Sequence, residues 1–539
     1  MSKTNSNSNN QRNSRSGNGS TNQKSKYSKK RNQRGISGAN VPSKDTADLQ
    51  EYRCDHNDVS WYNANPELLR TAGSLSFNNP LGIDIYPSIN NVTGIQIDEN
   101  KHWTIPGIIR LDLVPTVGKT DSPSSIVNVA ARKTYAYVRH ENSGHANYDA
   151  PDLMLYILAM DNLYSFYNWI TRLYGSIRLF SGVNRYFSKY LIETMGVNYE
   201  DIITHGNDLY FMLLNWAARL RSFYIPSGMS YLTRHAWLYS QIFKDSPDPK
   251  SQVYLFSPEY LYYWAENAGE WALKPIEIIP KSITASKLTF SDIVEKMEQM
   301  IAGVAMSEDF NIMSGDILKA YGSNTFTITP VDISYILEPT YSKEVLMQIH
   351  NARIITNYAI GDIKSDGVGV QLINESSCKT SDTPIWLSHN LFIDLHDVES
   401  SPENVMVASR LMCTYKAITH NSEELDWFGS EIVTHCTVTT LELEGTGIVD
   451  RTIITSDILF KPSAVDNTDL LTNLQILRSL ASFNDAPIVY ETWVESDDTR
   501  IGVTAAYADF DNYTIVTGET MSKLHECALL SEFGVASRN

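Results

Sequence analysis

Two pairs of histidine and cysteine residues lie close enough in the sequence to suggest covalent chemistry. His435 is beside Cys436, and His525 lies two positions before Cys527. An imidazole that takes the proton of a neighbouring thiol generates a nucleophilic thiolate. Adjacent residues of an extended strand point to opposite faces, however, which argues against the first pair. At both places we therefore expect buried thiols rather than a catalytic pair.

A second group has the side chains of a metal site without its spacing. His140, His145 and Asp149 all lie within residues 140–149. Imidazole nitrogens and carboxylate oxygens are common zinc ligands, but this spacing matches no established zinc motif. We favour a hydrogen-bonded loop that leads into a helix capped by Asp149.

Two short motifs suggest nucleotide chemistry, and both are incomplete. Gly118-Lys119-Thr120 ends like a phosphate-binding loop, but Leu113 occupies the position where that loop needs its first glycine. Ser496-Asp497-Asp498 lies between two predicted strands, as the metal-binding turn of a polymerase does. No partner aspartate motif precedes it, and such residues are common in hairpin turns. We expect neither nucleotide binding nor polymerase activity.

Other signatures of catalysis are missing from the sequence. It contains no serine nucleophile elbow, no zincin helix and no complete dinucleotide fingerprint. Its five cysteines are an odd number and widely scattered, which favours free thiols in a reducing compartment. We expect no catalytic residue, no cofactor and no metal, and therefore a protein that is not an enzyme.

The N-terminal 44 residues are the most distinctive part of the chain. They hold ten lysines and arginines, no acidic residue and few apolar side chains. So little apolar surface cannot offset a backbone entropy cost of roughly 1–2 kcal/mol per residue, so we expect a disordered arm. Its cations are suited to non-specific contact with nucleic-acid phosphates. The predicted contact residues are Arg12, Arg15, Lys24, Lys26, Lys29, Lys30, Arg31 and Arg34. The alternatives are a solvated tail or a nuclear-localisation stretch around Lys29-Lys30-Arg31.

The rest of the chain is acidic, with 34 basic residues against 62 acidic ones. Its 539 residues are enough for two or three domains, and 30 tyrosines and 10 tryptophans hint at large surfaces buried against partners. No apolar run follows the basic residues as a signal peptide requires. The most apolar segment, Leu153–Tyr174, carries one polar stripe of Asp161, Ser165, Asn168 and Arg172, which indicates a buried helix rather than a membrane span.

The elements that would position these residues change in type along the chain. Residues 45–125 predict irregular structure with a strand that Pro115 ends, and residues 125–345 predict mostly helices. The expected helices begin after Asp149 and close at Gly175, cover 207–223 and 291–305, and run from Gly315 to a stop at Gly322. After about residue 345, β-branched and aromatic runs at 437–459 and 488–516 predict meandering strands, before a final helix over 521–533. The fold class is therefore α+β, mainly α-helical, with strands concentrated in the C-terminal third.

Several strings in this order resemble a known family. They include the segment Val127–His140, the segment Asn142–Tyr156, Arg234-His235-Ala236-Trp237, and Ser307–Ala320. No single string is a mechanistic motif, and the specificity comes from their number and order over roughly residues 100–350. In this respect the chain resembles the capsid proteins of picobirnaviruses, small viruses with a bisegmented double-stranded RNA genome.

The resemblance implies a structural protein that assembles with copies of itself. Family members pair as homodimers, which close into a small icosahedral shell around the genome, and carry a basic arm on the lumen side. The implied partners are further copies of the chain and genomic double-stranded RNA, without a membrane. The implied location is the virion, and the host cytoplasm during assembly. The alternatives are the capsid of a neighbouring group such as the partitiviruses, or an RNA-binding module of a ribonucleoprotein.

This resemblance leads to three expected regions. Residues 1–44 would be the lumenal arm, residues 45–345 a helix-rich capsid region, and residues 346–539 a mixed α+β capsid region. The sequence leaves open which of the last two forms the shell and which forms projections.

Overall fold

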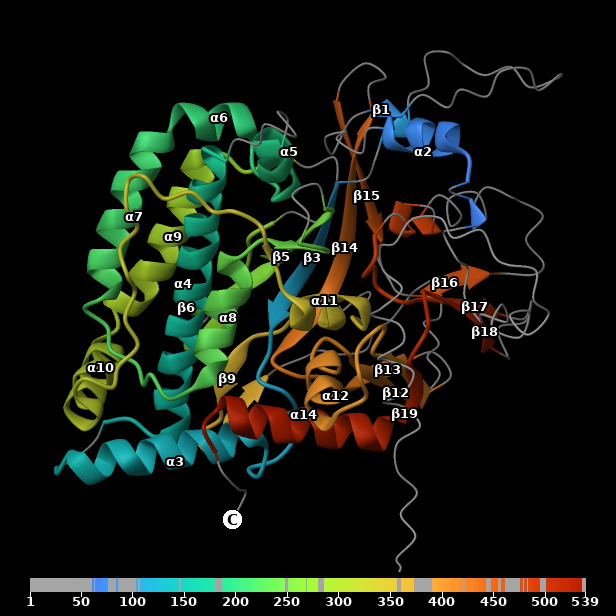
Figure 1. The fold of residues 1–539 in the computed structure, drawn as a ribbon. Helices are drawn as coiled ribbons and strands as arrows, with labels where there is room; N and C mark the ends of the chain where they lie inside the picture. Colours follow the sequence, from blue (N-terminus) through green and yellow to red (C-terminus); the bar gives the residue numbers. More distant parts are fainter. Residues whose placement is uncertain are drawn as a thin grey trace, which may run out of the picture. The chain divides into compact units, whose positions relative to one another are not determined.

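The structure is a computed structural model (Figure 1). It describes residues 61–62, 64–75, 84–85, 103–104, 107–144, 147–179, 187–247, 251–267, 269–279, 286–355, 360–372, 390–419, 422–442, 447–453, 457–460, 476–477, 479–481, 483–494 and 501–535. The chain divides into two units, Met1–Phe77 and Asn78–Asn539. In the first unit, helix α2 (Pro66–Gly73) begins at Asn65, whose side chain accepts a hydrogen bond from the Glu67 amide.

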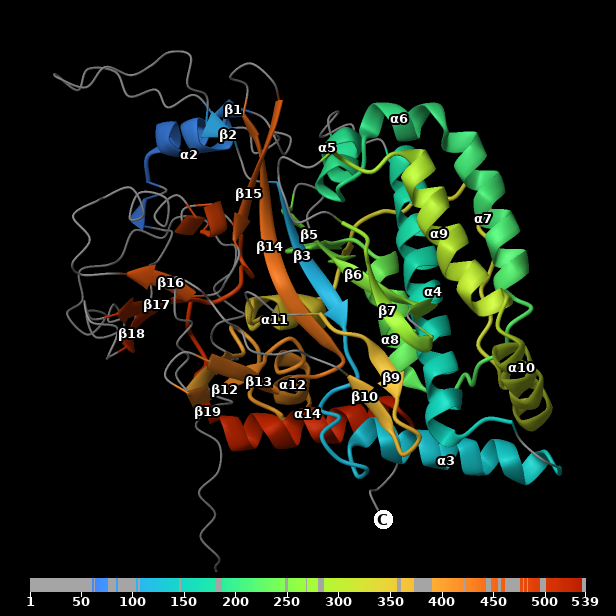
Figure 2. The ribbon, with the colours of Figure 1, turned by 180° about the vertical axis from the view of Figure 1, so that it is seen from behind.

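A sheet of six strands forms the centre of the second unit. Its order is β15 (Gly447–Ile453), β14 (Glu431–Glu442), β3 (Ile108–Pro115), β5 (Val253–Pro258), β4 (Phe243–Lys244) and β8 (Thr340–Tyr341). Strand β3 pairs antiparallel with β14 and parallel with β5, and all eight of its residues are buried. Figures 1 and 2 show the long strand β14 beside β3 from both sides. The sheet therefore joins strands from distant parts of the chain.

Helix α4 (Ala150–Ile177) is the main helix of the core. Asp149 and Asp152 form a capping box at its start, as the Asp149 cap prediction required. It contacts α3 (Ile126–Glu141), α5 (Phe187–Thr194), α7 (Gly206–Leu220), α8 (Ser230–Ser240), α9 (Phe290–Ala305) and α10 (Glu308–Tyr321), while α6 (Tyr199–Thr204) follows α5. Asp161, Ser165 and Arg172 of its polar stripe are buried. Among the described residues, no helix has the length and apolar character needed to cross a membrane.

Smaller sheets and helices complete the second unit. Strands β6 (Tyr260–Asn267), β7 (Glu270–Glu277), β9 (Ile363–Ser365) and β10 (Val370–Leu372) form one sheet. The other sheets contain β1 (Asp84–Ile85) with β2 (Trp103–Thr104), β11 (Asn390–Asp394) with β19 (Tyr513–Thr517), β12 (Thr414–Thr419) with β13 (Ser422–Trp427), and β16 (Asp457–Phe460) with β17 (Val489–Val494) and β18 (Ile501–Tyr507). The remaining helices are α11 (Lys343–His350), α12 (Pro402–Ala408) and α14 (Gly518–Glu532). Helices α3 and α14 lie side by side at one end in both views.

The predicted fold class, helix-rich α+β, is confirmed. Helix α9 lies within one residue of the range expected from the sequence, and Gly322, with φ 57°, ends α10 as expected. Helices α7 and α14 are present as predicted, but α7 ends three residues before the expected 223 and α14 begins three residues before the expected 521. The predicted end of α4 at Gly175 is wrong, because the helix continues to Ile177. A Cβ at Gly175 would meet Tyr335 and Leu337 at under 3.0 Å, so this glycine permits close packing. The predicted start of α10 at Gly315 is also wrong, because the helix begins at Glu308 and the side chain of Ser307 caps it.

The central sheet crosses the expected boundary near residue 345. Strand β14 lies beyond that position and pairs with β3 before it. The division into shell and projecting regions stays a prediction.

Candidate functional site

The eight predicted nucleic-acid contacts of the arm lie outside the described residues. They are Arg12, Arg15, Lys24, Lys26, Lys29, Lys30, Arg31 and Arg34. Their role therefore stays a prediction. His145 and the Ser496–Asp498 turn also lie outside the described residues.

The histidine–cysteine pairs are not arranged for thiolate chemistry. The His435 ring faces Glu259, with Nδ1 3.1 Å from Oε2, while the Cys436 thiol is buried and burial raises its pKa. His525 is buried and Cys527 is exposed. Of the cysteines that the structure describes, Cys413 and Cys436 are buried and Cys527 is exposed.

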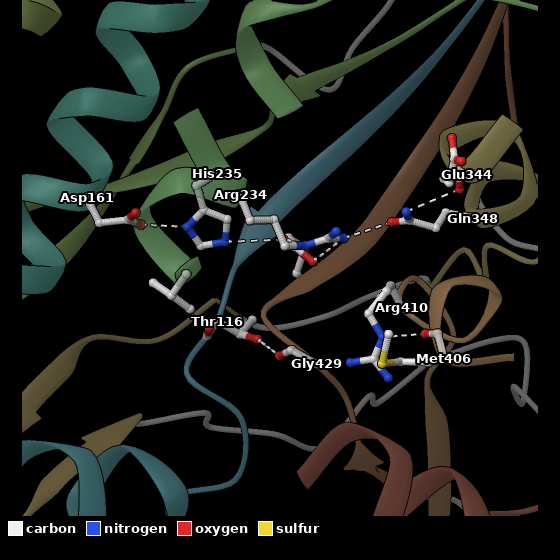
Figure 3. A network of polar contacts seen from close by, with 11 residues as sticks. Thr116, Asp161, Arg234, His235, Glu344, Gln348, Met406, Arg410 and Gly429 are labelled. Atoms are coloured by element: carbon white, nitrogen blue, oxygen red, sulfur yellow. Dashed lines mark hydrogen bonds and ion pairs between the residues drawn. The ribbon is translucent and has the colours of Figure 1, made fainter. Parts of the chain in front are cut away.

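The described residues instead bring together a network of charged side chains inside the second unit (Figure 3). Helix α4 supplies Asp161, helix α8 supplies Arg234 and His235, and strand β14 begins with Glu431. The side chains of Asp161, His235 and Glu431 have no exposed surface. Three elements from different parts of the chain thus converge on one buried site.

The distances within this network are those of direct ion pairs. Nδ1 of His235 lies 2.6 Å from Oδ2 of Asp161, and its Nε2 lies 3.4 Å from Oε1 of Glu431. Arg234 donates from Nε to Oε1 of Glu431 at 2.6 Å and from Nη2 to Oε2 at 3.1 Å. This two-point contact is the strong form of an arginine–carboxylate pair. Arg234 and His235 thus face the carboxyl groups of Glu431 and Asp161, and burial raises the pKa of Asp161 above its ordinary value.

The electrostatics follow from burial and from this pairing. Burial alone would lower the pKa of His235, but the carboxylates of Asp161 and Glu431 outweigh burial and raise it to about 10. Burial alone would raise the pKa of Glu431, but Arg234 and His235 hold it well below its usual range. His235 therefore carries a positive charge at neutral pH.

Polar contacts extend the network to neighbouring elements. Nη2 of Arg234 donates to Oε1 of Gln348 at 3.0 Å, which joins helix α11 to the site. Below it, Thr116 donates to the Gly429 carbonyl at 2.6 Å, and Tyr231 donates to the Thr116 carbonyl at 2.8 Å. Arg410 donates to the Met406 carbonyl, and Figure 3 shows it beside this group. These contacts connect helices α4, α8 and α11 to the central sheet. They also keep the charged groups of Asp161, His235 and Glu431 out of contact with solvent.

Of the four charged residues Asp161, Arg234, His235 and Glu431, only Asp161 stands out in the sequence itself. Asp161 appears in the predicted polar stripe, whereas Arg234 and His235 appear only as part of a resemblance and Glu431 not at all. A charged residue in an apolar helix implies a buried partner, and that is the signal available in the sequence.

Comparisons with known proteins decide the family. Residues 61–425 match the family model described as Picobirnavirus, Capsid protein. The chain belongs to this family. The family assignment made from the sequence is confirmed, and it takes the place of the partitivirus and ribonucleoprotein alternatives.

Two similar proteins support this membership. The capsid protein precursor of Human picobirnavirus (strain Human/Thailand/Hy005102/-) is 30% identical over 550 aligned positions, which cover 95% of this chain and 96% of that protein. The X-ray crystallographic structure of the picobirnavirus capsid matches with a TM-score of 0.75 at 19% identity, covering 89% of this chain and 99% of that one. The second match shows that the fold is shared.

As a picobirnavirus capsid protein, the chain is a structural coat protein of the virion. Its family consists of structural proteins, so the prediction that it is not an enzyme is confirmed. A shell implies association with further copies of the same chain. In a coat protein the buried network is best understood as part of the framework that keeps the subunit in one shape.

The charge on His235 predicts how this capsid protein responds to alkaline pH. Because the folded-state pKa, about 10, exceeds the ordinary value of 6.5, the stabilisation is complete below pH 6.5 and is lost as the pH rises through 10. We expect the wild type to lose on the order of a few kcal/mol of unfolding free energy over this range. Urea unfolding between pH 6 and 10 measures it.

Two substitutions separate this effect from other titrations. His235→Gln should lower the free energy of unfolding at pH 6 and reduce its decrease between pH 6 and 10. His140 is exposed, so His140→Gln should show the same pH dependence as the wild type. An unchanged slope in His235→Gln would show that another group causes the decline.

Proposed function

We propose that this coat protein forms homodimers, that the dimers close into a small icosahedral shell around double-stranded RNA, and that the basic arm contacts that RNA without sequence preference. Assembly would take place in the host cytoplasm. The observation that carries the proposal is membership of the capsid family over nearly the whole chain, since the similar capsid precursor aligns with 95% of it.

The charge distribution supports the assignment of RNA contact to the arm. Residues 1–44 carry ten cations and no anion, whereas the remaining chain has 34 basic and 62 acidic residues. Ten cations neutralise at most about ten phosphates, and contacts of this kind weaken steeply with salt. Arms from many subunits in one cavity would bind together with much greater avidity than one arm alone.

Deleting residues 1–44 tests both parts of the proposal. We expect the truncated protein to form closed particles of the same diameter in electron micrographs, because the arm contributes little packing surface. RNA that purifies with the particles should fall about tenfold or more, since the phosphate contacts are lost. Absorbance of purified particles at 260 and 280 nm measures this loss.

Matched arms distinguish charge from sequence. An arm with the same composition in scrambled order should retain RNA, while replacing the eight predicted contact residues by glutamine should not. A truncated protein that forms no particles would place the arm in assembly instead of RNA contact. A full-length protein that binds RNA as a soluble monomer would contradict the shell.

A further inference from the structure

Two loops of the second unit meet at the end of the β11–β19 sheet. One follows β11 at Asp394, and the other precedes β19 at Tyr513, the residue paired with Asp394 across the sheet. The Leu395 amide donates to the Asn512 carbonyl at 3.0 Å, and the Asn512 side chain donates to the Val398 carbonyl at 2.7 Å. The strand register and these hydrogen bonds hold the loops in a defined arrangement.

Three potential metal ligands converge where the loops meet. Asp394, His396 and Asp511 each direct one ligand atom to this point, and these atoms lie within 4.8 Å of one another. Zinc bonds to nitrogen and oxygen are about 2.0–2.2 Å long, so ligand atoms around one ion lie roughly 3–4 Å apart. Small side-chain rotations would bring the three groups to that spacing.

The imidazole of His396 has a nitrogen available for such a bond. Its Nδ1 atom is buried and has no hydrogen-bond partner within the described residues. The nearest acidic group is Asp511, whose Oδ1 lies 3.4 Å away. A buried nitrogen without a hydrogen bond is costly, and coordination would satisfy it.

The Asp394 carboxylate is oriented by a second layer of hydrogen bonds. It is fully buried, and its Oδ2 lies 3.0 Å from Nε2 of His350. Its Oδ1 accepts hydrogen bonds from the amides of Asn512 at 3.1 Å and His396 at 3.3 Å. Metal-binding carboxylates in proteins are commonly held in this way, which reduces the reorganisation that binding requires.

A cavity beside the cluster carries an excess of negative charge. Its volume is about 190 Å³, and its lining includes Asp394 and His396. Three further carboxylates line it, those of Asp245, Asp397 and Asp485, whereas Lys343 is the one lysine or arginine in the lining that the structure describes. Lys343 is already paired with Asp397 at 3.0 Å. Such surroundings attract a cation and leave room for the water molecules that complete its coordination.

We propose that Asp394, His396 and Asp511 form a binding site for a divalent transition-metal ion of the Zn²⁺ or Mn²⁺ type. One imidazole nitrogen with two carboxylate oxygens suits these ions better than Mg²⁺ or Ca²⁺, which prefer oxygen ligands alone. The ion would bridge two loops far apart in the sequence and would stabilise the end of the β11–β19 sheet. No metal was expected from the sequence, in which these three residues form no local motif.

Thermal unfolding of the full-length protein tests this site. After removal of metals with EDTA, we expect ZnCl₂ or MnCl₂, but not MgCl₂, to raise the unfolding midpoint. At about 100 times Kd the shift should be about 3 °C for a unit of this size. Titration calorimetry should give one ion per chain.

Two conservative variants should abolish the shift. His396→Asn suits the local backbone, since His396 has φ 52° and asparagine tolerates this region. Asp511→Asn removes one charge at an exposed position. Asp509→Asn, two positions earlier and also exposed, is the matched control and should keep the full response.

The outcomes are decisive in both directions. Loss of the shift in both ligand variants, with retention in Asp509→Asn and unchanged circular dichroism, supports the site. An equal shift in the ligand variants overturns it, because the ion then binds elsewhere. Absence of any zinc or manganese binding by the wild type in calorimetry also overturns it.

Discussion

Replacement of Glu431 by glutamine is expected to lower the free energy of unfolding by about 3–5 kcal/mol. The substitution keeps the shape of the side chain but removes one of two anions that balance Arg234 and His235. A net positive charge would then remain in a site whose carboxylate and imidazole side chains have no exposed surface. The new amide also turns a donor toward groups that are donors themselves. Urea unfolding followed by tryptophan fluorescence measures the loss.

The control for Glu431→Gln is the same change in a solvent-exposed ion pair. Glu519 lies 3.0 Å from Lys523, with side chains that are 82% and 70% exposed. Exposed pairs of this kind contribute about 0–1 kcal/mol, so Glu519→Gln should be nearly neutral. A loss below about 1 kcal/mol for Glu431→Gln would mean that the buried network relaxes or admits water, and that it does not hold the helices to the sheet.

Replacement of Gly303 by alanine is expected to destabilise the protein by about 1–2 kcal/mol. Gly303 lies in α9 where this helix crosses strand β6, and an added Cβ would meet the backbone carbonyl of Trp264 well inside 3.0 Å. The Trp264 carbonyl belongs to a paired strand and cannot rotate away. Either α9 or β6 must therefore shift, at a cost of about 1–3 kcal/mol or more. The better helix propensity of alanine recovers only about 0.5–1 kcal/mol.

Gly315→Ala in helix α10 provides a control of opposite sign. An added Cβ there has no atom within 4 Å, so only the gain in helix propensity remains. We expect a stabilisation of about 0.5–1 kcal/mol, measured in the same urea unfolding experiment. If both alanine variants were stabilised, the contact between α9 and β6 would have to be looser than the structure shows.

Local patterns predicted much of the helical structure. The three- to four-residue spacing of four apolar side chains predicted one apolar helix face. In α9 these side chains are buried: Ile293, Met297, Met300 and Val304. The polar stripe of residues 153–174 likewise predicted a buried helix, and α4 confirms it. Such predictions depend on side-chain spacing within one element, which the sequence contains in full.

Long-range partners could not be predicted in the same way. The sequence indicates that Asp161 needs a partner but not that His235 and Glu431 supply it. The aromatic segment 254–271 lies within the range expected to be helix-rich, yet it forms β5, β6 and the start of β7. Its tyrosines and tryptophans suit a strand as well as a helix, and tertiary pairing decides between them. The proposed ligands Asp394, His396 and Asp511 come together only through the register of β11 and β19.

The pairing of β3 with β14 has a consequence for synthesis. Asp112 of β3 and Thr434 of β14, which share a hydrogen bond, are 322 positions apart in the chain. At about 5–20 residues per second, a ribosome needs roughly 15–65 s to make the second strand after the first. During this interval one edge of β3 lacks its partner, and such an edge favours aggregation. Contacts so distant in sequence also form slowly. We therefore expect the subunit to complete its fold only near the end of translation, which delays its association with other copies until the chain is released.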